Sequence, residues 1–306
     1  MKSIFFFCII MVITSFSLPA QELCGRGDLV SINNGEYIIQ NNVWFTTTTA
    51  QCLTVNGSGF TITTSDHNVP TSGSAASYPC IYKDYFWLNC SSSDNTPIRI
   101  SEIQTAITTW STELESTGVW NTTSQAWFRP YSTASSYEEL GIKIWINHSG
   151  NIQPEGSIAG TTNIGGHTWE VWHPGTGLDS ITYRITSPRD SISLDYKSFI
   201  DDAVLRGYIQ SSWYLVFIRA GFEIWNGGTG LRLKSFQSTV SQNLGDVDNN
   251  GTVDIIDALK ISQYYVGLNP SDFNPSRADV DCNGSIDILD ALKVSQYYVG
   301  LISSIC

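Results

Sequence analysis

Short stretches in which apolar and polar side chains alternate recur between residues 28 and 240, separated by Gly, Asn, Ser and Pro. Alternation places successive side chains on opposite faces of a strand, and the intervening residues are typical of hairpin turns. The clearest such stretches are 35–40, 43–48, 59–64, 142–146, 168–172, 180–185 and 213–219. Only 195–206 has the spacing of an amphipathic helix, and Gly207 is a typical helix stop. Many strands and one helix predict an all-β jelly-roll sandwich of two packed antiparallel sheets.

The stretch 220–228 carries the first candidate chemistry. In an extended strand, Phe222 and Ile224 share one face, while Glu223 and Trp225 share the other. A carboxylate beside an indole suits sugar chemistry, because the aromatic plane stacks on a pyranose while the carboxyl moves a proton. The alternative is a solvated glutamate on the surface of a sheet.

A repeat follows a polar connector at 237–244. The acidic segment 246–257 and the apolar-periodic segment 258–267 recur 33 residues later as 279–290 and 291–300. Each twelve-residue segment has oxygen-bearing side chains at positions 1, 3, 5, 9 and 12 and Gly at position 6, which is the pattern of a calcium loop. Hard oxygen ligands favour Ca²⁺. The predicted ligands are Asp246, Asp248, Asn250, Thr252, Asp254 and Asp257 for the first ion, and Asp279, Asp281, Asn283, Ser285, Asp287 and Asp290 for the second, position 7 offering its carbonyl.

The net charge of the chain bears on which class of partner it can bind. The chain has a net charge of −12, which argues against a nucleic-acid backbone. Nine Asp against three Lys and Arg after residue 244 contribute −6 of that total, as expected of cation loops. The plentiful Trp, Tyr and Phe suggest a polar, planar ligand.

The first twenty residues resemble a secretory signal. Lys2 precedes an apolar run at 4–13, and residues 18–20 form a plausible cleavage site before Gln21. The run is short for a bilayer span, so we expect an exported, soluble protein with no membrane segment after cleavage. Removing Cys8 leaves six cysteines, an even number that favours disulfides. The economical pairs are Cys24–Cys52, Cys80–Cys90 and Cys282–Cys306, although connectivity does not follow from sequence alone.

The duplicated loop and helix closely resemble a type I dockerin, the module that attaches cellulosomal enzymes to the cohesins of a scaffold. The resemblance implies two Ca²⁺ ions, a cohesin partner, and an extracellular protein attached to a cellulosome. In that family, residues just before loop position 12 help to recognise the cohesin. Here they are the apolar pairs 255–256 and 288–289.

The upstream part resembles glycoside hydrolase family 12, the endo-β-1,4-glucanases and xyloglucanases with a jelly-roll fold. The matching segments are 41–44, 78–83, 100–103, 152–156, 165–172 and 220–225. The Cys24–Cys52 pair also fits the family's N-terminal disulfide. The resemblance implies a retaining enzyme without a catalytic cofactor, in which two glutamates lie about 5–5.5 Å apart.

Carried over residue by residue, the acid/base position of the family is Glu223. The nucleophile position, four residues before Trp145, holds Gly141, and Lys143 stands where the family has a methionine. The family's supporting Tyr-Asp pair is matched by Ser124 and Gln125. Alternation along this strand predicts that 142, 144 and 146 face the core, whereas 141, 143 and 145 face the cleft.

Three explanations remain open. In the first, Glu139 acts as the nucleophile; it lies on the same face about 6–7 Å further along the strand, so a local bulge would have to move it. In the second, the domain binds glucan without cutting it. In the third, water attacks from the space beside Gly141. The resemblance and the aromatic content suggest Trp44, Trp127, Trp145 and Trp225, with Asn42, as substrate-binding residues.

The resulting hypothesis is a secreted cellulosomal β-1,4-glucan hydrolase acting on cellulose, mixed-linkage glucan or xyloglucan. The expected organisation is a signal peptide at 1–20, a jelly roll at 21–240, a linker at 241–245 and an α-helical dockerin at 246–302. The rival hypotheses are a non-catalytic glucan-binding module and a purely structural scaffold component.

Overall fold

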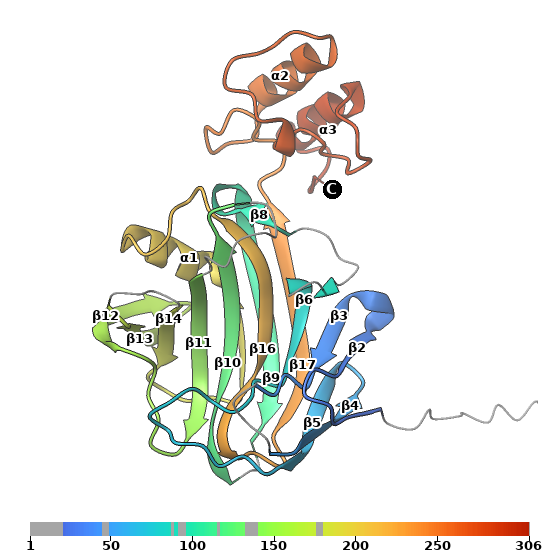
Figure 1. Cartoon of the computed structure of the whole chain (residues 1–306). Helices are drawn as coiled ribbons and strands as arrows, with labels where there is room; N and C mark the ends of the chain where they lie inside the picture. Colours follow the sequence, from blue (N-terminus) through green and yellow to red (C-terminus); the bar gives the residue numbers. More distant parts are fainter. Residues whose placement is uncertain are drawn as a thin grey trace, which may run out of the picture.

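The computed structural model describes residues 21–305 except 45–48, 87–88, 91–95, 115–116, 132–139 and 176–179. A β-sandwich comes first along the chain, and a small helical unit follows β17, which ends at Gln242 (Figure 1). The predicted signal segment at 1–20 lies outside the described residues. Within the described residues, no helix is long and apolar enough to span a bilayer.

The sandwich consists of two sheets, as predicted. The six-stranded sheet has the order β1 (Glu22–Leu23), β4 (Gln51–Asn56), β5 (Gly59–Ser65), β17 (Arg232–Gln242), β9 (Ile103–Glu113) and β15 (Ser191–Asp195). The larger sheet has the order β12 (Ser157–Ile164), β13 (His167–His173), β14 (Ser180–Ile185), β11 (Leu140–Ser149), β10 (Gly118–Arg129), β16 (Tyr214–Gly227), β6 (Cys80–Phe86), β3 (Tyr37–Gln40) and β2 (Leu29–Ile32). Two short strands extend it: β7 (Asn89–Cys90) pairs with β6, and β8 (Ile98–Arg99) pairs with β16.

One pairing departs from the expected antiparallel pattern. Strands β11 and β14 are parallel, with Gly141 opposite Ser180 and Trp145 opposite Arg184. Strands β12 and β13 lie between β11 and β14 in sequence and form an antiparallel hairpin. Because β13 also pairs antiparallel with β14, the chain runs along β14 in the direction of β12, which is also that of β11.

Several long strands were not predicted. They are β9, β10 and β17. In β9 and β17, Ser and Thr alternate with buried residues, whereas the Thr and Ser at 122–124 of β10 are buried themselves. On the six-stranded sheet these hydroxyls pair across strands on the surface: Thr109 Oγ1 lies 2.7 Å from Ser193 Oγ. Because β17 extends to Gln242, most of the expected connector at 237–244 is strand. Of the expected strand 43–48, Val43 forms only an isolated bridge, and 45–48 lie outside the described residues.

The two sheets enclose one large hydrophobic core. The predicted alternation along β11 is confirmed, because Ile142, Ile144 and Ile146 are fully buried in this core. The predicted helix is α1 (Tyr196–Leu205); Asp195 caps it by accepting a hydrogen bond from the Lys197 amide, and it ends before Gly207, which has φ +78°. Two 3-10 turns, Asn33–Gly35 and Ile100–Glu102, complete the sandwich.

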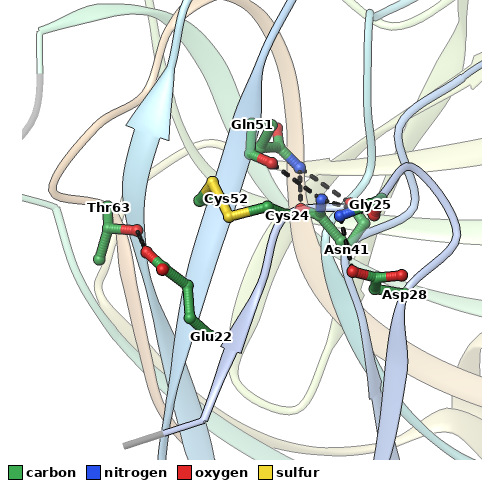
Figure 2. The surroundings of a disulfide bond; sticks show 8 residues. All are labelled: Glu22, Cys24, Gly25, Asp28, Asn41, Gln51, Cys52 and Thr63. Carbon is green, nitrogen blue, oxygen red and sulfur yellow. Dashed lines mark hydrogen bonds between the residues drawn. A yellow bond between two sulfur atoms is a disulfide. The ribbon is translucent and has the colours of Figure 1, made fainter.

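The Cys24–Cys52 disulfide joins the segment after β1 to β4 (Figure 2). In the same region, Glu22 and Leu23 of β1 pair with Thr54 and Leu53 of β4. The Cys80–Cys90 pairing is wrong, because Cys80 is a free, buried thiol. The register explains why: Cys90 lies opposite Tyr85, five residues along β6 from Cys80, or about 17 Å, far beyond the reach of a disulfide. Cys282 is disulfide-bonded, and Cys306 lies outside the described residues.

The C-terminal unit contains α2 (Ile255–Tyr265), the 3-10 turn η3 (Pro275–Arg277) and α3 (Ile288–Tyr298). Its core is separate from that of the sandwich and includes Val247, Ala258, Ile261, Ala278, Val280, Ala291 and Val294. The two helices begin in the same way, each with an aspartate N-cap and a capping box.

Candidate active site and calcium loops

Glu223 lies in the middle of β16 on the face of the large sheet that is turned away from the shared core. We call this the site face. Its neighbours Phe222 and Ile224 are fully buried in the core, as the alternation predicts. Glu223 itself is only 5% exposed. A carboxylate removed from water to this degree requires donors on both of its oxygens.

Three donors from two neighbouring strands meet that requirement. Asn121 Nδ2 donates to Glu223 Oε2 over 2.7 Å, and Gln125 Nε2 donates to Oε1 over 3.2 Å. The Lys143 ammonium lies 3.5 Å from Oε1. Asn121 faces Glu223 directly in the register of β10 and β16, whereas Lys143 comes from β11 on the far side of β10.

Gln125 links Glu223 to a second layer of the site. Its Oε1 accepts hydrogen bonds from Arg219 Nη2 over 2.6 Å and from Trp127 Nε1 over 3.2 Å. The Arg219 guanidinium in turn lies over the ring of Tyr78, 4.6 Å from the centroid. Burial raises the pKa of Tyr78 well above its usual value, so its neutral hydroxyl donates to the carbonyl of Thr123. The orientation of the Gln125 amide, which aims its nitrogen at Glu223, is therefore set by two donors on its oxygen.

At the position expected for the nucleophile, Gly141 has no side chain, and the Trp127 indole lies beside its backbone. Gly141 on β11 lies opposite Trp127 in the register. A Cβ atom placed on Gly141 would lie 3.1–3.4 Å from atoms of the Trp127 ring. Trp127 is stacked on Phe217 on its other side, with 6.3 Å between ring centroids. The carboxylate-bearing substitute, Glu139, lies outside the described residues.

The four tryptophans expected to bind sugar divide into two pairs. Trp145 is 4% exposed and Trp225 is 7% exposed, and both belong to a small apolar cluster with Ala75 and Ile152. Their rings are therefore packed against neighbouring side chains and expose little area in this structure, and a role in binding sugar stays a prediction for these two. Trp44 and Trp127 are half-buried.

Asn42 lies at the edge of the same region. It adopts φ +42°, a conformation that asparagine tolerates better than most residues. Its Nδ2 donates to the carbonyl of Tyr78 over 3.0 Å. Asn42 thus ties the segment that leads to Trp44 to the segment that begins β6.

Two residues of the site were missed by reasoning from sequence. Asn121 and Arg219 both contact the Glu223–Gln125 pair, yet neither lies in a motif that marks it. The available signal was the alternation of side chains along a strand. It places Asn121 on the same face as Gln125, and Arg219 on the same face as Glu223. Alternation identifies the face on which a side chain lies, but only the register of β10 against β16 shows that these side chains meet.

The two acidic segments fold as matching loops around clustered oxygens. In each loop, carboxylate oxygens from positions 1, 3 and 12 lie within 4.8 Å of one another: Asp246, Asp248 and Asp257, and again Asp279, Asp281 and Asp290. The position-12 carboxylates are fully buried. Asp257 accepts from the amides of Val247, Asp248 and Asp254, and Asp290 accepts from Val280, Asp281 and Asp287. Burial, as the largest cause, raises the pKa of Asp257.

The donor set of these loops fits a hard divalent cation. Every side chain offered is an oxygen, and the glycine at position 6 has a positive φ in both loops, +91° at Gly251 and +86° at Gly284. Position 9, Asp254 or Asp287, is also the N-cap of the helix that follows. A cation held here would be tied directly to the start of α2 or α3.

Comparison with known proteins places both units. Residues 35–241 match the family model described as glycosyl hydrolase family 12, and residues 244–298 match dockerin type I domain. The chain belongs to glycoside hydrolase family 12. Its C-terminal unit is a type I dockerin, a class of domain that typically binds calcium and attaches to cohesins.

Individual proteins agree with this assignment. The solved structure of endoglucanase cel12A from Rhodothermus marinus is 41% identical, covers 72% of this chain and 99% of its own, and superposes with a TM-score of 0.69. Probable cellulase Cel12b of Mycobacterium tuberculosis is 35% identical over 148 residues, which are 48% of this chain and 98% of that protein. Xyloglucan-specific endo-beta-1,4-glucanase A of Emericella nidulans is 25% identical over 231 residues, which are 72% of this chain and 91% of that protein.

Membership of family 12 makes the sandwich of this dockerin-bearing chain a glycoside hydrolase domain, in a family that acts on β-glucans. It also defines what is unusual about the site face. Gly141 stands at the position where the sequence resemblance predicts the nucleophile, and Lys143, two residues later, forms an ion pair with Glu223.

Proposed function

We propose that this chain is a secreted, endo-acting β-1,4-glucan hydrolase in which Glu223 is the general acid/base. The observation that carries the proposal is the buried carboxylate of Glu223, held by Asn121, Gln125 and Lys143 on the site face of a family 12 fold. Trp44 and Trp127 supply accessible aromatic surface on the same face. Cellulose, mixed-linkage glucan and xyloglucan are the substrates to test, because relatives bear the names endoglucanase and xyloglucan-specific endo-beta-1,4-glucanase.

In this proposal Glu223 gives a proton to the leaving glycosidic oxygen and then takes one from the attacking water. Asn121 and Gln125 fix the rotamer of the carboxyl, because they hold its two oxygens from one strand. Lys143 offsets its negative charge when the proton has been given away. For the attacking group we propose Glu139, the carboxylate that shares the strand parity of Gly141.

The proposal is tested by reducing-sugar release from barley-type β-glucan and xyloglucan. We expect Glu223→Gln to lower the rate at least about a thousandfold, because the amide cannot donate a proton. The matched control is Glu170→Gln. Glu170 forms an ion pair with Arg184 on β13 and β14 of the same sheet, so this change also removes a paired glutamate. Full activity of Glu223→Gln would refute the assignment.

The attacking group is tested by two further variants. If Glu139 attacks, Glu139→Ala abolishes hydrolysis, and Gly141→Glu does not increase it. If activity is absent in the unmodified chain and appears in Gly141→Glu, the Glu139 proposal is wrong. Gly141→Glu requires a shift of the Trp127 ring by a few tenths of an ångström, so its melting temperature is measured alongside.

A second candidate function is glucan binding without cleavage. The specific observation that favours it is the Lys143–Glu223 ion pair beside Gly141. Among the residues that the structure describes, Glu223 is the one carboxylate at this place, whereas a retaining enzyme needs two. This function predicts retention of the chain on glucan in affinity electrophoresis with no new reducing ends. Loss of that retention in Trp127→Ala would assign the binding to the site face.

The dockerin supports a further part of the proposal, attachment to a cohesin outside the cell. The apolar pairs expected to contact the cohesin are exposed: Ile255 is 49% exposed, Ile256 45%, Ile288 48% and Leu289 54%. The alternative, that they form the core of the unit, does not fit this exposure. We propose that each loop holds one Ca²⁺ through the six residues named for it above.

A further inference from the structure

Arg277 lies between the two units and contacts both of them. It ends the 3-10 turn η3 and is 5% exposed. One guanidinium nitrogen, Nη2, donates to the carbonyl of Ser101 in the sandwich over 2.8 Å. The other, Nη1, donates to Oδ2 of Asp246 over 3.0 Å and to its carbonyl over 3.2 Å.

Asp246 is position 1 of the first calcium loop and is 1% exposed. Its two oxygens also accept from the loop amides of Asn250 and Gly251. One side chain of the first loop is therefore in direct contact with the residue that reaches the sandwich. Buried ion pairs with this geometry hold the groups that they join in one arrangement.

Neighbouring hydrogen bonds also join the sandwich to the C-terminal unit. The amide of Asn243 donates to the carbonyl of Glu102, and Ser276 Oγ donates to Glu102 Oε1 over 3.2 Å. The amide of Gly245 donates to the carbonyl of Arg277. The joint at the end of β17 is thus built from specific polar contacts. Arg277 and Asn243 each bond both to the sandwich and to Asp246, and Arg277 is the one of the two that carries a charge.

The internal repeat has no second arginine at the position that corresponds to Arg277. With the offset of 33 residues, the counterpart of Arg277 is Leu244, which carries no charge. Asp279, the counterpart of Asp246, is half-buried, whereas Asp246 is buried. The two loops have matching ligand patterns but different electrostatic surroundings.

We propose that Arg277 is an interdomain clamp that makes the first calcium loop part of the joint between the hydrolase domain and the dockerin. The clamp has two consequences, and both rest on the calcium loops proposed above. The dockerin is held against the sandwich and does not tumble freely. The guanidinium lowers the affinity of the first loop for Ca²⁺, because it offsets one of the negative charges of that loop.

Three variants of the full chain separate these consequences. Arg277→Gln removes both the charge and the two-pronged guanidinium group. We therefore expect the dockerin to tumble independently, and the affinity of the first loop for Ca²⁺ to rise about tenfold. Arg277→Lys keeps the charge but loses the two-pronged contact, so the dockerin is released with little change in affinity. Lys260→Gln is the matched control: Lys260 lies 3.3 Å from Asp248 in the same loop, and its removal raises affinity without releasing the dockerin.

Tumbling is measured from the ¹⁵N relaxation of dockerin amides in the full chain with saturating Ca²⁺, and affinity from calorimetric titration with CaCl₂. Equal rotational correlation times for the two units in the unmodified chain, and a shorter one for the dockerin in Arg277→Gln, are the expected results. Independent tumbling in the unmodified chain, or unchanged tumbling in Arg277→Gln, would overturn the clamp. Absence of Ca²⁺ binding in every variant would contradict the calcium loops instead, and the tumbling result would still decide whether Arg277 joins the units.

Discussion

The calcium loops and the Glu223 site both depend on buried carboxylates, but they are assembled over very different lengths of chain. Asp257 reaches back ten residues to the amide of Val247, and all the predicted ligands of its loop lie within the twelve residues 246–257. Glu223 is bound by Asn121 and Gln125, which are 102 and 98 residues away. Both copies of the loop carry the full pattern of oxygen-bearing side chains, whereas the sandwich has Gly141 where the resemblance predicts a carboxylate. A site encoded within twelve residues can thus be recognised from its local pattern, whereas a site built across strands depends on residues that lie far apart along the chain.

Removing calcium should give the largest difference between the two regions. We expect a chelator to abolish cohesin binding and to melt α2 and α3, because binding energy at a site absent from the unfolded chain contributes to folding. The sandwich should keep its melting temperature, since its core is separate. Calorimetry with and without EDTA, followed by a cohesin pull-down, measures both effects; undiminished cohesin binding in excess chelator would contradict the prediction.

The twofold repeat allows the loops to be compared with each other. Asp257→Ala and Asp290→Ala each leave three backbone amides without their acceptor, so each should destabilise the dockerin by about 3 kcal/mol or more. Chemical denaturation of the full chain, monitored by helix signal, measures this. A loss below about 0.5 kcal/mol in either variant would show that the buried carboxylates do not organise the loops.

On the sandwich, the corresponding change is Lys143→Met. It removes the cation beside Glu223 but leaves Asn121 and Gln125 in place, so the expected loss of stability is about 1–3 kcal/mol. The matched control is Lys197→Met, which breaks an exposed ion pair with Asp201 and should cost less than about 1 kcal/mol. Equal effects of the two variants would mean that Glu223 does not depend on the lysine.

The smallest effect concerns Cys80, which lies on the site face beside Tyr78. Burial, as the main cause, raises the pKa of its thiol to about 11. At pH 8 only about one molecule in a thousand carries the reactive thiolate, so alkylation should be slow in the native state and fast after unfolding. Peptide-resolved mass spectrometry after iodoacetamide treatment tests this, and rapid native labelling of Cys80 would contradict it.

Much of the fold follows from alternation alone. Strand β14 was predicted with its observed limits, and α1 to within one residue at each end, because both combine a clear period with capping or turn residues. Strands β9 and β17 were missed because their outward faces carry Ser and Thr, which lowers the contrast that marks a half-buried strand. The Cys80–Cys90 pairing failed because it depends on strand register: Cys80 begins β6, whereas Cys90 in β7 lies opposite Tyr85 near the other end of β6.

What the sequence by itself determined are the features encoded within a few residues: the calcium loops, the capped helices of the dockerin, and the face on which Glu223 lies. Period and ligand spacing suffice there, because the interacting groups are neighbours along the chain. Only the tertiary structure decided that Asn121, Gln125 and Lys143 meet at Glu223, that Trp127 lies over Gly141, and that Arg277 joins the first loop to the sandwich. These contacts depend on strand register and on the packing of separate units, and neither leaves a local pattern in the sequence.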